Sequence, residues 1–321
     1  MVPHLFPVPP IGVGTPGVES LPGYVSRLAG EHMLQPHFLF RELQRVCPDF
    51  DDGLLDPKFF ATDARRVDGT FGAGPKLADV LAGATGVADV QTLGMRRWHD
   101  VLDPKHKSLF KPVRSWCPEC HAERAMNGEP PYEPLLWHID GVMHCHAHRT
   151  RLRTECPSCG SAQPMLAQYG WLFTCPVCDG ALAAAGSDDR SVQELGPEER
   201  FRMDAVGRLL ARHNAGEPRP TRAGFVQRLH EAWDMHGSEL GRTNPTLKRS
   251  VRDNVYRWRQ PRHRPTLGGV LRFSRCTDVD LVWLLDGHGG MHWTPGGGGG
   301  AALEDVAPFP LPAGASGVTM R

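Results

Sequence analysis

Long apolar runs are missing from this 321-residue sequence. No stretch reaches the roughly 18 apolar residues that a membrane-spanning helix needs, so we expect no contact with a membrane. The first residues also lack the basic region and apolar run of a secretory signal. We therefore expect a cytoplasmic protein, in which paired cysteines are more often metal ligands than disulfides.

Catalytic motifs are missing as well. The sequence has no Gly-x-x-x-x-Gly-Lys-Ser/Thr loop for nucleotide hydrolysis, no Gly-x-Ser-x-Gly and no His-Glu-x-x-His. A formal dinucleotide fingerprint, Gly12-x-Gly14-x-x-Gly17, contains Pro16, and no strand pattern precedes it. These absences predict that the protein is not an enzyme.

The net charge is zero, yet the basic residues are unevenly distributed. Residues 242–275 contain ten Lys or Arg and one acid, Asp253. Such a block favours a polyanion partner, most simply nucleic acid, although a solvated arginine face is the alternative. The candidate nucleic-acid-binding residues are Lys248, Arg249, Arg252, Asn254, Arg257, Arg259, Arg262 and Arg264.

Cysteine and histidine residues form four pairs with a two-residue spacer. The pairs are Cys117 and Cys120, Cys145 and His148, Cys156 and Cys159, and Cys175 and Cys178. Two such knuckles complete one tetrahedral zinc site, so the sequence predicts two structural Zn²⁺ ions. Sequential pairing is the economical assignment, and an interleaved arrangement stays open. His146 is the alternative to His148.

Both predicted sites have four protein ligands, which is typical of structural zinc, because catalytic zinc keeps an open position for water. The remaining cysteines, Cys47 and Cys276, are expected to be small buried apolar residues. His288 and His292 are expected to be an exposed pair.

Helical periodicity dominates the rest of the sequence. Ser20 is a candidate N-cap for a helix that ends at Gly30, and a second helix covers Phe38 to Val46. A Thr85-Gly86-Val87 turn between short helices has the layout of a helix-turn-helix. We expect a mainly α fold with small zinc-ribbon or zinc-finger elements. Its predicted parts are an N-terminal helical, helix-turn-helix-like domain (1–112), a double zinc-finger segment (113–183), a basic helix-turn-helix-like domain (197–294) and a Gly/Pro-rich tail (295–321).

The run Glu-Ser-Leu-Pro-Gly-Tyr-Val-Ser-Arg-Leu-Ala at residues 19–29 resembles the opening of the TniQ/TnsD family of transposition target-selection proteins. The Trp-Cys-Pro-Glu-Cys knuckle at 116–120 is similar to that family, as are Leu136-Trp137, the Cys-His-Ala-His run at 145–148 and the Cys156 pair. The resemblance covers residues 5–180 and implies a helical part followed by two zinc fingers.

The last third is similar to repressor-type helix-turn-helix domains. Val255 and Trp258 would face the core, while Arg252, Asn254 and Arg257 would face outward toward base edges. Arg259, Arg262 and Arg264 would contact phosphates. The pattern departs from that family at Gly268-Gly269 and in a weak second helix around 238–242. A basic helical bundle that contacts protein or RNA is the alternative.

The family resemblance implies a target-site selector for a transposon. Such adaptors bind DNA or dock on an RNA-guided CRISPR effector complex, and then recruit an AAA+ ATPase regulator. We therefore expect a nucleoid-associated protein, and the sequence leaves open whether it forms a homodimer. The alternatives are a free-standing zinc-containing transcription regulator and an enzyme of nucleic-acid metabolism with one open zinc site.

Overall fold

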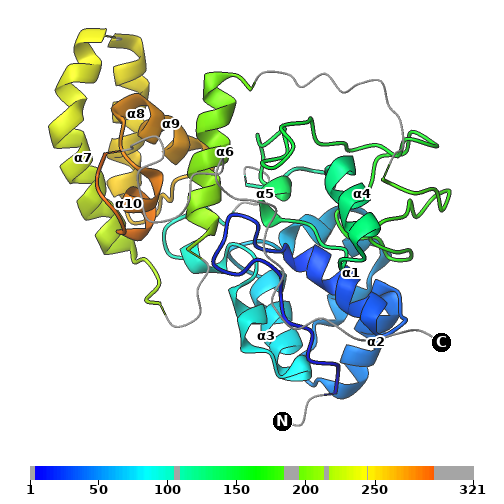
Figure 1. Ribbon diagram of the computed structural model, residues 1–321. Coiled ribbons are helices and arrows are strands. Elements are labelled where there is room, and N and C mark those ends of the chain that lie inside the picture. Colours follow the sequence, from blue (N-terminus) through cyan, green and yellow to red (C-terminus); the bar gives the residue numbers. More distant parts are fainter. Residues whose placement is uncertain (1–3, 105–108, 184–194, 213–216, 244, 293–321) are drawn as a thin grey trace.

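The protein is mainly helical, as the sequence predicts (Figure 1). The computed structural model describes residues 4–104, 109–183, 195–212, 217–243 and 245–292, and it describes no side chains from 237 to 250. Within these residues there are no extended strands, only isolated β-bridges. The predicted tail at 295–321 lies outside the described residues, as do residues 184–194 between two of the predicted domains.

The N-terminal half is built from three α-helices: α1 (Leu21–Glu31), α2 (Pro36–Val46) and α3 (Ala73–Thr85). Short helical turns connect and follow them: η1 (Asp52–Leu55), η2 (Phe59–Asp63), η3 (Ala64–Arg66), η4 (Ala88–Thr92) and η5 (Arg96–Trp98). The Ser20 side chain caps α1 by accepting from the Gly23 N–H, so the predicted N-cap is confirmed. Helix α1 ends one residue after Gly30, and Met33 follows in the left-handed region.

The Gly86 turn has the predicted layout. Gly86 adopts a left-handed conformation at the C-cap of α3, and η4 packs back against that helix. However, η4 is a 3₁₀ turn of five residues. An element of that length is too short for the recognition helix of a helix-turn-helix.

The middle segment holds α4 (Pro118–Asn127), the short α5 (Leu135–His138) and a chain of tight loops. Single bridges pin these loops, including Trp116 to Arg153 and Glu155 to Ala162. A small buried cluster of Trp116, Trp137, Leu152, Leu182 and five of the cysteines forms their core. The segment therefore lacks a large apolar core of its own.

In the described residues, five helices make up the C-terminal part. They are α6 (Pro197–Leu210), α7 (Arg222–Thr243), α8 (Pro245–Arg259), α9 (Leu267–Thr277) and α10 (Leu281–Asp286). In Figure 1, helix α6 lies between the α7–α10 group and the rest of the chain. It contacts α5 on one side and α9 and α10 on the other.

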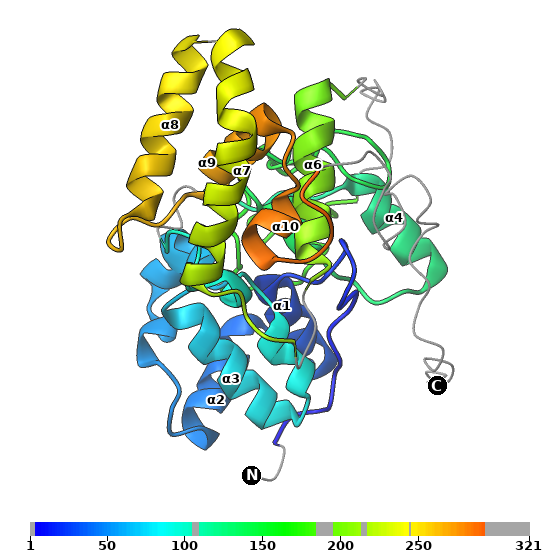
Figure 2. The same cartoon turned by 90° about the vertical axis from the view of Figure 1, so that its left-hand side faces the viewer.

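Two details differ from the repressor-type pattern. The separate helix expected around 238–242 is the end of α7, which continues to Thr243 and forms a hairpin with α8. In both views α7 and α8 lie side by side (Figure 2). Gly268 and Gly269 do not interrupt a helix, because they occupy the first turn of α9 after the Thr266 N-cap. A Cβ at Gly269 would stand 2.9 Å from the Trp258 ring, so the close packing of Trp258 requires this glycine.

One apolar core extends from Val18 to Leu285, joining the N-terminal and C-terminal helices. Val255 and Trp258 are buried in it, as predicted. Among the described residues, no helix combines the length and the hydropathy needed to cross a membrane.

Candidate metal centres and nucleic-acid interface

The first candidate metal centre brings together Cys117, Cys120, Cys145 and His148. Cys117 is the N-cap of α4 and Cys120 lies in its first turn, while the other two residues lie on a tight loop. The Sγ atoms of Cys120 and Cys145 are 3.6 Å apart. The His148 Nδ1 atom lies 3.4, 3.2 and 3.8 Å from the sulfurs of Cys117, Cys120 and Cys145.

These separations are those of a tetrahedral zinc site. With Zn–S bonds of about 2.3 Å and a Zn–N bond of about 2.0 Å, tetrahedral ligands stand about 3.5–3.8 Å from one another. A close set of three sulfurs and one ring nitrogen, largely screened from solvent, is therefore compatible with zinc. The four donors form a full set, which is typical of a structural ion.

The structure places His148, and not His146, in this group. His146 is buried but lies outside this group. The Nε2 atom of His148 contacts the Glu123 carboxylate at 2.9 Å, so its second ring nitrogen has the carboxylate partner usual for a metal-binding histidine. Glu119 accepts from Thr150 and lies 3.2 Å from the Cys117 sulfur.

The second candidate centre contains Cys156, Cys159, Cys175 and Cys178. Two sulfur pairs, Cys156 with Cys178 and Cys159 with Cys175, are each 3.7 Å apart. Here too the distances fit tetrahedral sulfur ligands. Cys159 and Cys178 are exposed, whereas all three cysteines of the first centre are buried. The sequential pairing of the four knuckles is thus the one that the structure brings together.

Three of the four knuckles share one backbone geometry. The residue after the second ligand adopts a positive φ and donates to the carbonyl of the first ligand at 2.9 Å. These residues are Arg149, Gly160 and Asp179. His148 therefore occupies the position that Cys159 and Cys178 occupy in the other two knuckles. The Cys117 knuckle differs because it is the start of helix α4.

Buried ion pairs connect the start of α1 to the middle segment. Glu19 and Arg27 form a pair at 2.6 Å, and both are almost fully buried. The Asp68 carboxylate accepts from the Leu21 N–H at the start of α1 and contacts His138 Nδ1, in each case at 2.8 Å. His138 also approaches Glu133, which pairs with Arg114. The buried charges and the N-cap of the 19–29 run therefore stabilise the fold, because each of them has a hydrogen-bond or ion-pair partner.

The pKa of Glu133 shows that this network stabilises the ionised form of its carboxyl group. Burial would raise the pKa of its carboxyl group, but the Arg114 guanidinium and the His138 hydrogen bond outweigh burial and lower that pKa to about 2. Burial would likewise lower the pKa of His138, yet the hydrogen bonds to Asp68 and Glu133 outweigh it and raise that pKa. The network is therefore ionic and internally neutralised.

Four predicted nucleic-acid residues line a cleft between the two parts of the chain: Asn254, Arg257, Arg262 and Arg264. Arg252 is exposed on another face of α8, beside Asp253 at 3.5 Å. Arg259 is half-buried and does not line the cleft. Lys248 and Arg249 lie in α8, but their side chains are outside the described part. The structure thus divides the predicted set over different faces.

Three further arginines line the cleft but are not among the contacts predicted from the sequence: Arg202 of α6, and Arg272 and Arg275 of α9. Arg272 and Arg275 belong to the basic block of residues 242–275 but are not among the candidate contacts. Cys276, expected to be buried, is half-buried and lines the same cleft. Cys47 is buried, as predicted.

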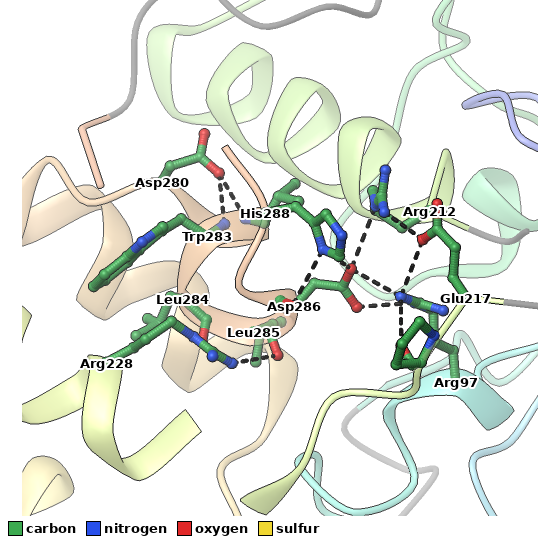
Figure 3. A network of polar contacts seen from close by, with 12 residues as sticks. Arg97, Arg212, Glu217, Arg228, Asp280, Trp283, Leu284, Leu285, Asp286 and His288 are labelled. Atoms are coloured by element: carbon green, nitrogen blue, oxygen red, sulfur yellow. Dashed lines mark hydrogen bonds and ion pairs between the residues drawn. The ribbon is translucent and has the colours of Figure 1, made fainter. Parts of the chain in front are cut away.

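A third cluster of potential ligands, Glu217, Asp286 and His288, is an ion-pair network (Figure 3). Arg97 donates to both carboxylate oxygens of Asp286, at 2.8 and 3.0 Å, and Arg212 contacts Asp286 and Glu217. Two guanidinium groups therefore already neutralise the two carboxylates, and His288 contacts Asp286 from the rim at 3.0 Å. This arrangement joins the N-terminal half to α6 and α10.

The structure is that of a mainly helical protein with two four-donor clusters compatible with zinc and with a basic cleft. Residues 10–152 match the TniQ family, and this part of the chain therefore belongs to it, as the sequence resemblance implies. The match ends shortly after His148, so it contains the complete first cluster and stops before the second. No curated protein matches the chain.

Proposed function

We propose that the protein is a target-site selection adaptor for transposition that binds nucleic acid and recruits an AAA+ ATPase regulator. The observation that carries this proposal is the TniQ match over residues 10–152, which supports a transposition-associated DNA-binding role. The adaptor role needs no catalytic group in this chain.

In this proposal the two zinc ions are structural. When bound, each ion would hold two knuckles together through four protein donors. The protein's own residues prepare the sites: α4 presents Cys117 and Cys120, and the Glu123 carboxylate orients the His148 ring. Since the segment has only a small core, metal binding would supply much of its folding free energy.

Nucleic acid would be bound by the C-terminal part. Arg257 of α8, Arg262 and Arg264 of the loop after it, and Arg272 and Arg275 of α9 line the cleft, where arginines outnumber carboxylates. The TniQ domain with the first cluster, and the second cluster after it, would remain free to contact the ATPase regulator. Targeting could then be direct, through DNA, or guided, through a CRISPR effector complex with its RNA.

A pull-down from the native host tests this proposal. The tagged, zinc-loaded chain is the bait, and captured proteins are identified by mass spectrometry. Capture of an AAA+ ATPase supports direct targeting, and capture of CRISPR subunits as well supports guided docking. Tight sequence-specific DNA binding without an ATPase would replace the proposal with a free-standing transcription regulator. A matched bait with Cys117→Ser and Cys145→Ser shows whether the first cluster is needed for capture.

A further inference from the structure

The cleft between the two parts of the chain has a volume of about 1060 Å³. That is at the upper end of the roughly 300–1,000 Å³ typical of ligand pockets, so it has room for an extended ligand. Its lining comes from distant segments: the 103–104 turn, Asp140 after α5, the start of α6, and the α8–α9 region. It is thus a feature of the assembled chain and not of a single helix.

Positive charge is in excess inside the cleft. Six arginines line it, Arg202, Arg257, Arg262, Arg264, Arg272 and Arg275, against the carboxylates of Asp103, Asp140 and Glu198. Glu198 is near both Arg202 and Arg275, at 3.8 and 3.7 Å. Arg264 donates to the His99 carbonyl at 2.9 Å. Within the described part of the chain, no salt bridge engages Arg257, Arg262 or Arg272, and the side chains of all three are exposed.

The charges are also divided by their origin. The three arginines without an ion pair come from α8, the loop after it and α9. Asp103 comes from the 103–104 turn and Asp140 from the segment after α5, on the other side of the junction. The third carboxylate, Glu198 of α6, is already near Arg202 and Arg275. A ligand in the cleft would therefore meet the guanidinium groups of Arg257, Arg262 and Arg272 on one side and the carboxylates of Asp103 and Asp140 on the other.

We propose that this cleft binds a single strand of nucleic acid, with its phosphates on Arg257, Arg262 and Arg272 and its base edges toward Asp103 and Asp140. Guanidinium groups pair with phosphates through two parallel hydrogen bonds. Carboxylates accept from the exocyclic amino group of cytosine. The inference deepens the proposed function by naming the form of nucleic acid that this site takes.

A duplex fits the same cleft poorly. It carries a phosphate backbone on each flank, so a duplex inserted between the two sides would bring phosphates against Asp103 and Asp140. A single strand has phosphates along one edge and bases along the other, which matches the two sides of the cleft. Unpaired nucleotides of either DNA or RNA satisfy this requirement.

The test compares short fluorescent oligonucleotides, single-stranded and duplex, in anisotropy titrations with the full zinc-loaded chain. The Arg257→Gln/Arg272→Gln variant should bind the single strand at least about tenfold more weakly, and the slope of log affinity against log salt should fall by about 0.7 for each phosphate that is no longer neutralised. Arg252→Gln is the matched control, since Arg252 is exposed on α8 outside the cleft, and it should leave single-strand binding unchanged. Oligo(dC) should bind more tightly than oligo(dT), and Asp140→Ala should reduce that preference.

The outcomes separate this inference from the proposed function. If a duplex binds and single strands do not, the inference fails and the adaptor proposal stands. Equal losses of affinity for the Arg252→Gln and cleft variants also overturn the inference. If the cleft binds single strands as described but no ATPase is captured, the inference stands and the proposed function fails.

A measurement on the unaltered protein covers the case in which a variant does not fold. Cys276 lines the cleft, and Cys47 is buried away from it. Bound single strand should slow the alkylation of Cys276, mapped by peptide mass spectrometry, while Cys47 serves as the internal reference. An unchanged rate at Cys276 with saturating strand would contradict the proposal.

Discussion

Arg97 and Asp286 form a two-point ion pair although 189 positions separate them in the sequence. The Arg97 side chain is 7% exposed and that of Asp286 is fully buried, so each is the main neutralising partner of the other. Arg97 also donates to the Pro218 carbonyl at 3.1 Å. Arg97 in the N-terminal half thus contacts both the turn before α7 and helix α10.

Replacing Arg97 with alanine should destabilise the protein by about 3–5 kcal/mol, because it leaves the Asp286 carboxylate buried with less compensation. Urea unfolding followed by circular dichroism measures the change. Arg96→Ala is the matched control. Arg96 pairs with Asp79 at the surface, and such pairs contribute at most about 1 kcal/mol. The Arg97→Leu/Asp286→Leu double variant should recover much of the stability, and equal destabilisation at 96 and 97 would contradict this account.

Purified protein should contain two zinc ions per chain by elemental analysis, one for each four-donor cluster. Chelation should unfold at least the middle segment, since metal affinity and folding are linked there. Cys145→Ser should reduce zinc occupancy at the first site and Cys156→Ser at the second. The two-site assignment fails if the unaltered chain holds a single zinc.

His148→Ala should lose zinc from the first site, whereas His146→Ala should keep both ions. The His148 ring nitrogen stands within 3.8 Å of all three sulfurs. His148→Cys should retain two ions, because a thiolate is also a zinc ligand. Glu123→Gln should weaken the first site by roughly 10–100-fold through the orientation of the His148 ring. Zinc loss from His146→Ala with retention in His148→Ala would reverse the assignment.

Stability should rise with pH above neutrality because of Lys111. Burial lowers the pKa of this lysine from 10.5 to about 7, and its ammonium donates to Ser115 and to the Trp137 carbonyl. Between those two values the unfolded chain holds a proton that the folded chain lacks, so unfolding becomes less favourable as pH rises. The cost of burying the charge is fully present below pH 7.

Chemical unfolding at pH 7 and at pH 10 checks this expectation. The unaltered protein should gain stability over that range, and Lys111→Met should gain clearly less. Zinc content is measured at both pH values so that metal loss is not mistaken for the lysine effect. Equal slopes for the two proteins would show that Lys111 is solvated in the folded state.

Local sequence signals predicted the local parts of the structure well. The x-x spacing of the knuckles indicated the two clusters, because a tight turn fixes both ligands within a few residues. Apolar periodicity indicated the helices of the C-terminal part, with Val255 and Trp258 facing inward. Ser20 signalled the start of α1 through its cap.

Relationships between distant segments could not be read in this way. Nothing local to Arg97 points to Asp286, and Arg272 comes to line one cleft with Asp103 only in the folded chain. The separate helix expected around 238–242 failed for another reason: α7 continues to Thr243 despite Gly237 and Gly241, which disfavour a helix interior. Tertiary packing decides on which face of the protein a charged residue lies. Apolar periodicity indicates only that the residue is outside the core.

The ion pairs behind α1 determine where this chain can be divided. A fragment ending at residue 112 keeps Asp68 but discards Glu133, His138 and Arg114, so the start of α1 would lose the groups that surround it. The middle segment that contains the Cys117 knuckle also contains Arg114, Glu133 and His138. We therefore expect that this segment cannot be exchanged between relatives by itself. A chimaera that receives this segment must also receive helix α1 from the same protein.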